Sequence, residues 1–211
     1  AGERLNPAPK KSINTSIPEI PAEISFAGEN VPLEIYDVKE RLDREVLVNT
    51  FWHSQTLVLL KKSKRYLEII EPILKEEGIP DDFKYLCMAE SGLANVVSPS
   101  NAAGFWQFLE ATAKQYGLEV NDEVDERYDL EKATRAACKY LKNSYDTLKS
   151  WALVAASYNM GLSGIMNSLK DQEVDSYYDL HLNTETSRYV FRLIAIKLIH
   201  KNPEDFHFTL K

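Results

Sequence analysis

Glycine and proline divide this chain of 211 residues into segments of helical length, and this punctuation constrains its fold more than any other feature. Within the segments, apolar residues recur at three- and four-residue intervals, the spacing of a helix that buries one face. No stretch shows the strict apolar–polar alternation of a half-buried strand. The sequence therefore predicts a mainly α fold, with helices at 38–49, 52–60, 72–77, 80–90, 105–116, 130–145, 151–159 and 186–200, a loop at 95–104 and a turn-rich segment at 160–185.

Several helix ends are predicted from single residues. Pro72 should separate two helices, because proline lacks a backbone donor and restricts the residue before it. Gly92 and Gly117 follow helical segments at the position where a left-handed residue ends many helices. Asp129 is expected to cap the helix that follows it, since its carboxylate accepts hydrogen bonds from free backbone N–H groups.

The N-terminal part differs from the rest of the chain. Residues 1–31 contain several prolines and few periodic apolar positions, so we expect an extended arm, ordered only where it lies on the body. Helical periodicity begins after this arm, and residues 32–64 are expected to form an N-terminal helical segment.

Composition and charge exclude several classes of protein. The chain has 25 Lys and Arg against 32 Asp and Glu, a net charge of −7. No basic stripe is present to neutralise phosphates, so no nucleic-acid partner is expected. Two charge-free runs, 91–109 and 150–169, have the length of a membrane span, but both contain Asn and Gly. We expect them to be interior segments, and no transmembrane helix is predicted.

Cysteine and histidine are sparse. Cys87 and Cys138 are too few for a disulfide scaffold and too far apart for a metal knuckle. Both fall on apolar helix faces, so buried thiols are the favoured interpretation and a disulfide bridge is the alternative. No metal or other cofactor is expected, because the four histidines lack ligand spacing (His53, His181, His200 and His207).

Glu90 does not match its apolar surroundings. It follows Phe83 by seven residues and Leu86 by four, so it lies on the apolar face of its predicted helix. It is also at the helix C-terminus, where carbonyl dipoles disfavour a negative charge. Burial and the dipole both raise the pKa of its carboxyl, which keeps the proton that a general acid requires. The alternative is a structural glutamate held by an arginine or by backbone donors.

Polar but uncharged side chains follow Glu90 in otherwise apolar segments. They are Gln107, Tyr158 and Asn159, and Gly92 and Gly104 allow the backbone to approach closely nearby. Neutral amides beside aromatic rings suit a sugar better than an ion. These residues therefore strengthen the interpretation of Glu90 as a functional acid.

Four short motifs follow one another along the chain: Glu90-Ser91-Gly92, Gly104-Phe105-Trp106-Gln107, Ser157-Tyr158-Asn159 and Glu185-Thr186 with Tyr189. In this order they resemble the motifs of the lysozyme-like lytic transglycosylases of the soluble type and the membrane-bound D type. The segment 78–86 resembles that family's approach to its catalytic glutamate, and the resemblance extends over residues 65–206. Phe105 and Ser157 depart from the leucine and alanine usual at their positions, and neither change removes a chemical group.

The resemblance implies a fold and an activity. Residues 65–211 are expected to form a lysozyme-like (goose-type/SLT) catalytic domain behind the N-terminal arm and helical segment. The implied activity is cleavage of the bond between N-acetylmuramic acid and N-acetylglucosamine in peptidoglycan, leaving 1,6-anhydro ends. Glu90 would protonate the glycosidic oxygen and then take a proton from the muramyl 6-hydroxyl. No second carboxylate stands out as a partner, unlike the usual pair of a glycosidase.

The resemblance also implies roles for the neighbouring side chains. Gln107 and Asn159 would hydrogen-bond the sugar or its N-acetyl group, or else a backbone group. Tyr158 and Tyr189 would line the cleft, one hydroxyl fixing the Glu90 carboxyl, or else pack in the core.

Other polar and aromatic residues near the motifs receive a more structural interpretation. Ser91 would orient Glu90, contact the substrate or cap the loop. Trp106 and Trp151 are expected to pack in the core rather than stack on sugar.

The expected setting is the bacterial periplasm or cell envelope. Residues 1–11 lack the apolar stretch of a signal peptide, so this placement implies an export signal removed before Ala1. The expected partner is the glycan strand of peptidoglycan, and the expected state is a monomer. Two alternatives remain: a goose-type lysozyme, which adds water and so gives a heavier product, and a catalytically silent peptidoglycan-binding protein.

Overall fold

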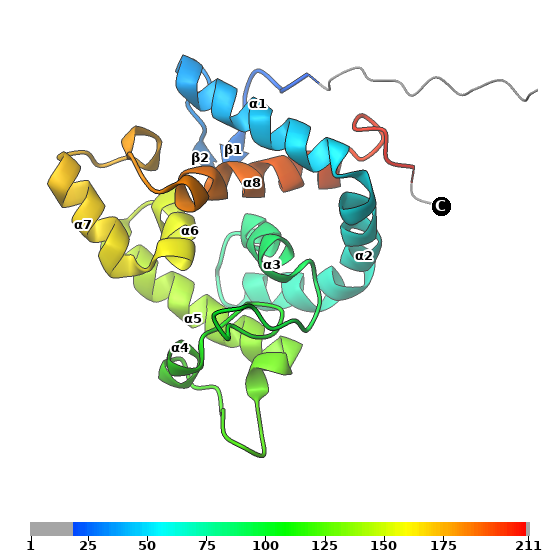
Figure 1. The fold of residues 1–211 in the computed structure, drawn as a ribbon, viewed down its shortest axis with the longest axis vertical. Helices are drawn as coiled ribbons and strands as arrows, with labels where there is room; N and C mark the ends of the chain where they lie inside the picture. The colour runs from blue at the N-terminus through cyan, green and yellow to red at the C-terminus, as the bar shows by residue number, and fades with distance from the viewer. Residues whose placement is uncertain (1–18, 210–211) are drawn as a thin grey trace, which may run out of the picture.

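The computed structural model describes residues 19–209, and this part is mainly α-helical, as predicted. Helix α3 (Lys84–Ser91) lies at the centre of the view in Figure 1, with other helices around it. Helix α8 (Thr184–Lys201) packs against α1, α3 and α6. The remaining helices are α1 (Tyr36–Phe51), α2 (His53–Glu76), α4 (Glu110–Gln115), α5 (Leu130–Leu148), α6 (Trp151–Met160) and α7 (Leu162–Gln172).

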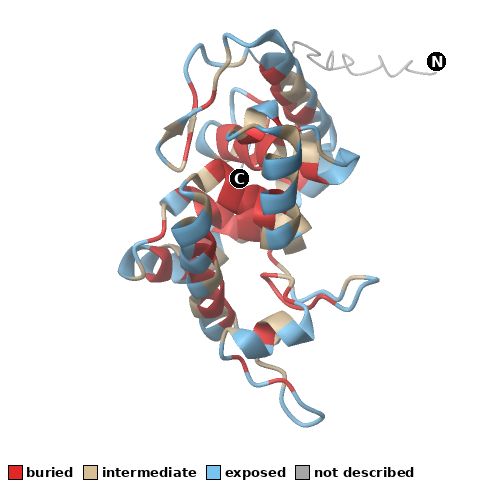
Figure 2. Ribbon diagram, turned by 90° about the vertical axis from the view of Figure 1, so that its left-hand side faces the viewer, coloured by how far each residue is buried: buried red, intermediate tan, exposed pale blue. Residues whose placement is uncertain are grey.

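Burial follows from these contacts. Helix α8 is apolar on nearly all sides, and residues 189–199 are buried except Arg192, because neighbours pack on several of its faces. Figure 2 shows buried residues gathered on inward-facing helix surfaces and exposed residues on the outer turns. Trp106 is fully buried, and its Nε1–H donates to Thr134 Oγ1 at 2.9 Å. Trp151 stacks on Tyr145 with ring centroids 4.0 Å apart. Both tryptophans pack against protein, as expected.

Cys87 and Cys138 are both buried and both free. Their predicted state as buried thiols is confirmed. The predicted cap of α5 is confirmed as well, because the Asp129 carboxylate accepts from Lys132 N–H at 2.9 Å.

The described part of the N-terminal arm, residues 19–31, is fastened to the helical body. It contains a two-residue hairpin, β1 (Ser25–Phe26) paired antiparallel with β2 (Glu29–Asn30), which the sequence did not predict. The Glu29 carboxylate caps the start of α6, accepting from Trp151 N–H at 2.5 Å and Ala152 N–H at 3.1 Å. The arm is therefore part of the packed structure here. Residues 1–18 of the expected arm lie outside the described residues.

A second tie links the arm to the start of α3 and to α8. The Asp82 carboxylate, in the short 3₁₀ turn Asp81–Phe83, accepts from Ala27 N–H at 2.7 Å and from Lys197 Nζ at 2.6 Å. Lys197 Nζ also donates to Ser25 O at 2.6 Å. These groups are nearly buried, so each charge is paired where water is scarce.

The expected helix break at Pro72 is wrong. Helix α2 runs without interruption from His53 to Glu76 and contains Pro72. The proline is exposed, while Ile70, Ile73 and Leu74 are buried. A proline inside a helix removes one backbone hydrogen bond and costs about 3 kcal/mol of stability. Burial of Ile70, Ile73 and Leu74 offsets this cost, because each buried apolar side chain contributes about 1.5–3 kcal/mol. The boundary expected between residues 64 and 65 lies inside this helix.

The expected helix at 105–116 is also wrong in its first half, since only α4 forms. Gly104 has φ +80° and Gln107 has φ +49°, both in the left-handed region that a helix does not use. Ala103 and Phe108 instead exchange backbone hydrogen bonds at 3.0 and 3.2 Å. This tight turn occupies residues 104–107, so α4 begins only at Glu110.

The segment 160–185, expected to be turn-rich, contains a full helix, α7. Gly161 has φ +88° and separates α6 from α7, and buried Ile165 holds α7 to the core. The charge-free run 150–169 is thus divided between two helices. No helix in the described residues is long and apolar enough to cross a membrane.

Candidate active site

Glu90 occupies the last turn of α3, as the sequence predicts. The helix ends at Gly92, which has φ +60° and donates its N–H to Met88 O at 3.0 Å. Phe83 and Leu86 are fully buried, and Glu90 lies beside them at intermediate exposure. The carboxyl is therefore close to the core but not sealed within it.

The surroundings of Glu90 raise the pKa of its carboxyl towards neutral pH. Burial raises the pKa of Glu90 to about 7. The Tyr189 hydroxyl, which donates a hydrogen bond to Glu90 Oε1, and the Arg192 guanidinium oppose that rise in pKa, and Glu185 adds to it. Burial is the largest of these effects. A carboxyl with this pKa is able both to give and to take a proton near pH 7.

The two tyrosines of the site have different partners. Tyr189, on α8, is buried and bonds to Glu90. Tyr158, on α6, donates to Trp106 O at 2.7 Å. Burial, followed by the charge of Glu90, raises the pKa of the Tyr158 hydroxyl well above its usual range. Tyr158 therefore lies within electrostatic reach of Glu90 and supports the turn that ends at Gln107.

Gln107, Tyr158 and Asn159 line one cavity of about 270 Å³. Gln107 Nε2 donates to Gly104 O at 2.8 Å and to Val96 O at 2.9 Å, so its amide nitrogen is held by backbone. Asn159 Oδ1 accepts from Thr186 Oγ1 at 2.8 Å. Within the described residues, the Gln107 carbonyl oxygen and the Asn159 amide nitrogen have no protein partner. Each side chain thus keeps one hydrogen-bonding group for a ligand.

Only glycine fits at position 104 in this turn. A Cβ built there would lie 1.9 Å from Arg127 O, a distance at which atoms overlap. The close approach joins the Gly104–Gln107 turn to the 3₁₀ turn Glu126–Tyr128. Because glycine has no Cβ, it allows both this close approach and the left-handed backbone at position 104.

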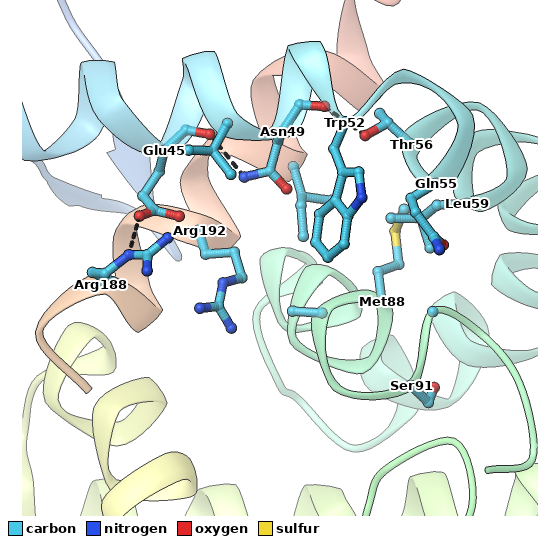
Figure 3. A pocket seen from close by; sticks show the side chains of 14 residues that line it. Glu45, Asn49, Trp52, Gln55, Thr56, Leu59, Met88, Ser91, Arg188 and Arg192 are labelled. Atoms are coloured by element: carbon cyan, nitrogen blue, oxygen red, sulfur yellow. Dashed lines mark hydrogen bonds and ion pairs between the residues drawn. The ribbon is translucent and has the colours of Figure 1, made fainter. Parts of the chain in front are cut away.

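Ser91 and Gln107 line different cavities. Its Oγ donates to Cys87 O at 3.3 Å, a bond within its own helix. It lines a second cavity, of about 450 Å³, formed by α1, α2, α3 and α8 (Figure 3). Glu90 lines neither of the two cavities, but its chain neighbours Ala89 and Ser91 line the second one. Glu90 is thus adjacent in sequence to residues that line this Ser91 cavity, and it lies within electrostatic reach of Tyr158, which lines the Gln107 cavity.

Sequence reasoning did not assign Arg192 or Thr186 to the site. Arg192 Nη1 and Nη2 contact the two carboxylate oxygens of Glu185 at 2.9 and 3.3 Å. Thr186 is buried and orients Asn159. The positions 185, 189 and 192 share one face of a helix, and this spacing was the signal available for Arg192. No group of three or more metal-ligating side chains is arranged to hold an ion within residues 19–209.

The fold and the site together define the class of protein. It has a mainly α domain, and the last turn of its central helix α3 carries a glutamic acid whose pKa is raised. Residues 68–180 match the transglycosylase SLT domain family, and this chain belongs to that family. The match contains Glu90, Gln107, Tyr158 and Asn159, and it ends before Tyr189. The family predicted from the sequence motifs is therefore confirmed.

Named relatives give the same result. The chain is 26% identical over 191 residues to the membrane-bound lytic murein transglycosylase D of Escherichia coli strain K12. It has the same identity to the protein of that name in Escherichia coli O6:H1. Each alignment covers 86% of this chain and 41% of the relative. The chain thus spans about two fifths of the length of the curated relatives that it matches.

Proposed function

We propose that this chain is a peptidoglycan lytic transglycosylase that cleaves the β-1,4 bond between N-acetylmuramic acid and N-acetylglucosamine. The observation that carries the proposal is the raised pKa of Glu90, about 7, at a carboxyl that Tyr189 holds in place. Membership of the transglycosylase SLT domain family supports the same reaction class.

In the first step, Glu90 donates its proton to the glycosidic oxygen as the bond from that oxygen to the anomeric carbon breaks. The Tyr189 hydroxyl and the Arg192 guanidinium then stabilise the carboxylate that remains. In the second step, the muramyl 6-hydroxyl attacks the anomeric carbon of its own sugar and gives its proton to Glu90. The product is a 1,6-anhydro ring, the carboxyl returns to its starting state, and no water is consumed.

A single carboxyl serves both steps in this scheme. Glu185 is the carboxylate whose charge acts on Glu90, and both of its oxygens face Arg192. Hydrogen bonds from Arg192 lower the pKa of Glu185, which makes it a weak base as well as a group that does not act as an acid. A glycosidase that activates water usually needs a second carboxyl to accept its proton. Because both Glu185 oxygens are held by Arg192 and its basicity is lowered, it is poorly suited to that role, and this supports the transglycosylase reaction over hydrolysis.

The cavity lined by Gln107, Tyr158 and Asn159 would hold a sugar next to the scissile bond. The free carbonyl oxygen of Gln107 and the free amide nitrogen of Asn159 would bond its hydroxyl or N-acetyl groups. Ser91 would contact the strand on the other side of Glu90. We place the protein in the periplasm or cell envelope, acting as a monomer on glycan strands.

Mass spectrometry of fragments released from purified sacculi tests this function. We expect muropeptides that end in 1,6-anhydro-N-acetylmuramic acid, each lighter by one water than the hydrolytic product. Reducing-end muramic acid as the main product would identify a goose-type lysozyme. Binding to sacculi without any release would identify a peptidoglycan-binding protein.

A further inference from the structure

The Ser91 cavity has a wall that lies outside the matched family region. Asn49, Trp52, Gln55 and Thr56 come from the end of α1 and the start of α2, before residue 68. Figure 3 shows the indole of Trp52 directed from these helices towards α3, with the amide of Asn49 beside it. Asn49 Nδ2 donates to Glu45 O of its own helix at 2.7 Å, so its carbonyl oxygen is the group left for a ligand. At about 450 Å³ the cavity has a size usual for small-molecule sites.

Trp52 is the most unusual member of this wall, because 62% of its surface is exposed. It lies at the junction of α1 and α2, where its N–H donates to Val48 O at 3.0 Å and its carbonyl accepts from Thr56 N–H at 3.1 Å. The backbone that carries the indole is therefore fixed. An exposed aromatic face flanked by the neutral amides of Asn49 and Gln55 suits a ligand with apolar faces and polar edges, as a sugar ring has.

A second observation comes from Glu45 at the other end of the cavity. Its side chain is 1% exposed, and Oε1 accepts from Arg188 Nε at 2.5 Å. Its other oxygen, Oε2, is buried and has no hydrogen-bond partner among the described residues. Buried polar atoms are seldom left unpaired, because such a group loses its hydration without replacement. A ligand hydroxyl or amide N–H in the cavity would supply the missing donor.

Both arginines that line the cavity are paired with carboxylates. Arg188 is paired with Glu45, and Arg192 is paired with Glu185. Neither guanidinium of the lining is therefore left without a carboxylate to bind the acidic groups of a peptide stem. This pairing favours an uncharged ligand with hydroxyl and amide groups.

We propose that the Ser91 cavity binds an N-acetylhexosamine unit of the glycan strand, with Trp52 under the ring and Glu45 Oε2 accepting from a hydroxyl or amide. The proposal rests on the proposed function, since it makes the strand pass from the Gln107 cavity across Glu90. It adds that α1 and α2 extend the sugar-binding surface, so that longer strands bind more tightly than short ones.

Calorimetric titration with chitohexaose, a soluble chain of six N-acetylglucosamine units, tests the site. The full chain carries Glu90→Gln in every sample, so that the ligand is not cleaved. We expect Trp52→Ala to weaken binding by about tenfold, the effect of losing one aromatic contact of about 1.4 kcal/mol. Chitobiose, too short to span both cavities, should bind weakly in either background.

The control is Phe51→Ala. Phe51 is 55% exposed and adjacent to Trp52, but it does not line the cavity. We expect it to leave chitohexaose binding unchanged. Gln55→Ala, at an exposed position that lines the cavity, provides a second variant that does not touch the helix junction. It should weaken binding by a smaller factor than Trp52→Ala, and equal thermal unfolding curves would show that both variants are folded.

The outcomes separate this site from the proposed function. Equal binding by the Trp52, Gln55 and Phe51 variants, or no binding of chitohexaose at all, overturns the saccharide site. Tight binding of a free stem peptide that depends on Trp52 overturns it too, because the ligand is then the peptide. If binding depends on Trp52 while the unsubstituted chain releases nothing from sacculi, the site stands and the proposed function fails.

Discussion

The hydroxyl of Tyr189 on α8 donates a hydrogen bond to the carboxyl of Glu90 on α3, across 99 residues of sequence. The bond fixes the direction of a carboxyl whose burial otherwise favours the neutral form. It also connects the matched family region, which ends at residue 180, to a helix beyond it. The geometry at Glu90 therefore depends on how α8 packs against α3.

Replacing Glu90 with Gln removes the transferable proton and keeps the side-chain size. We expect the release of fragments from sacculi to fall by roughly 10²–10⁴-fold or more, since one group acts as both acid and base. Glycan binding should persist. Glu110→Gln is the matched control, because Glu110 is exposed and its carboxylate accepts from Lys114, and its activity should be unchanged. Substantial turnover by Glu90→Gln would remove Glu90 from the mechanism.

The raised pKa of Glu90 predicts the pH dependence of activity. Because the acid form starts the reaction, the rate should fall as pH rises through about 7. A pH–rate profile with sacculi measures this alkaline limb. A rate that stays constant from pH 6 to pH 9 contradicts the assignment.

The same raised pKa predicts a pH-dependent difference in stability. A glutamate with pKa 4.5 unfolded and about 7 folded binds its proton more tightly when folded. Stability from this group is therefore lost as pH rises from about 4.5 to about 7, by up to about 3 kcal/mol. The Glu90→Gln variant has no titrating group at this position and does not lose this stability. Its free energy of unfolding, relative to that of the unsubstituted protein, should therefore increase as pH rises across that range. Urea unfolding at pH 4.5 and 7.5 tests the difference, and an equal difference at both pH values would contradict it.

Tyr189→Phe removes the hydrogen bond to Glu90 without changing the ring. Since that bond lowers the pKa of Glu90, its loss should move the alkaline limb of the pH–rate profile to higher pH. The maximum rate should fall as well, because the carboxyl is no longer oriented. Tyr158→Phe, which loses a bond to Trp106 O instead, is expected to leave the limb in place. An identical shift in both variants would argue against the specific role of Tyr189.

Gly104→Ala should be strongly destabilising. The added Cβ meets Arg127 O at 1.9 Å, in addition to the strain of φ +80°. Gly28→Ala is the control, since Gly28 has φ +84° but no atom within 4 Å of the added Cβ. The control should lose about 1–2 kcal/mol from the left-handed backbone alone. Thermal unfolding should show a clearly larger loss for Gly104→Ala, and equal losses would contradict the clash.

The two cysteines should be unreactive in the folded protein. Burial raises the pKa of Cys138 to about 12 and that of Cys87 well above its usual range, so little thiolate forms near neutral pH. A colorimetric thiol reagent should find no reactive group under native conditions and two groups after denaturation without reductant. Fewer than two would indicate a disulfide.

The position of Glu90 could be predicted because it depends on local sequence, namely the apolar spacing from Phe83 and a glycine that ends the helix. The path of α2 through Pro72 could not, because burial of Ile70, Ile73 and Leu74 outweighs a local preference of the chain. The same holds for Gln107, whose left-handed backbone lies in a turn that packs closely against Arg127 O, a group 20 residues further along the chain.

The site residues differ in how far their grouping could be predicted. That one tyrosine hydroxyl, of Tyr158 or Tyr189, would hold Glu90 followed from the family resemblance, and the structure shows that it is Tyr189. The wall of the Ser91 cavity had no sequence signal, since it joins α1 and α2 to α3 and to α8, which lies more than 100 residues later. The division into an arm, a helical segment and a catalytic domain at 65–211 stays a prediction.

The carboxylate of Glu29 caps α6 at one end, and Tyr158 and Asn159 lie at the other end of the same helix. The ten residues of α6 thus connect the arm to two side chains that line the Gln107 cavity. A fragment trimmed to residues 68–180 would lose this anchor along with α8, and α6 would begin with unpaired N–H groups. A shortened version of the protein should therefore keep the hairpin at 25–30. A truncation that retains every motif but removes Glu29 would still weaken the N-terminal end of the helix that carries Tyr158 and Asn159.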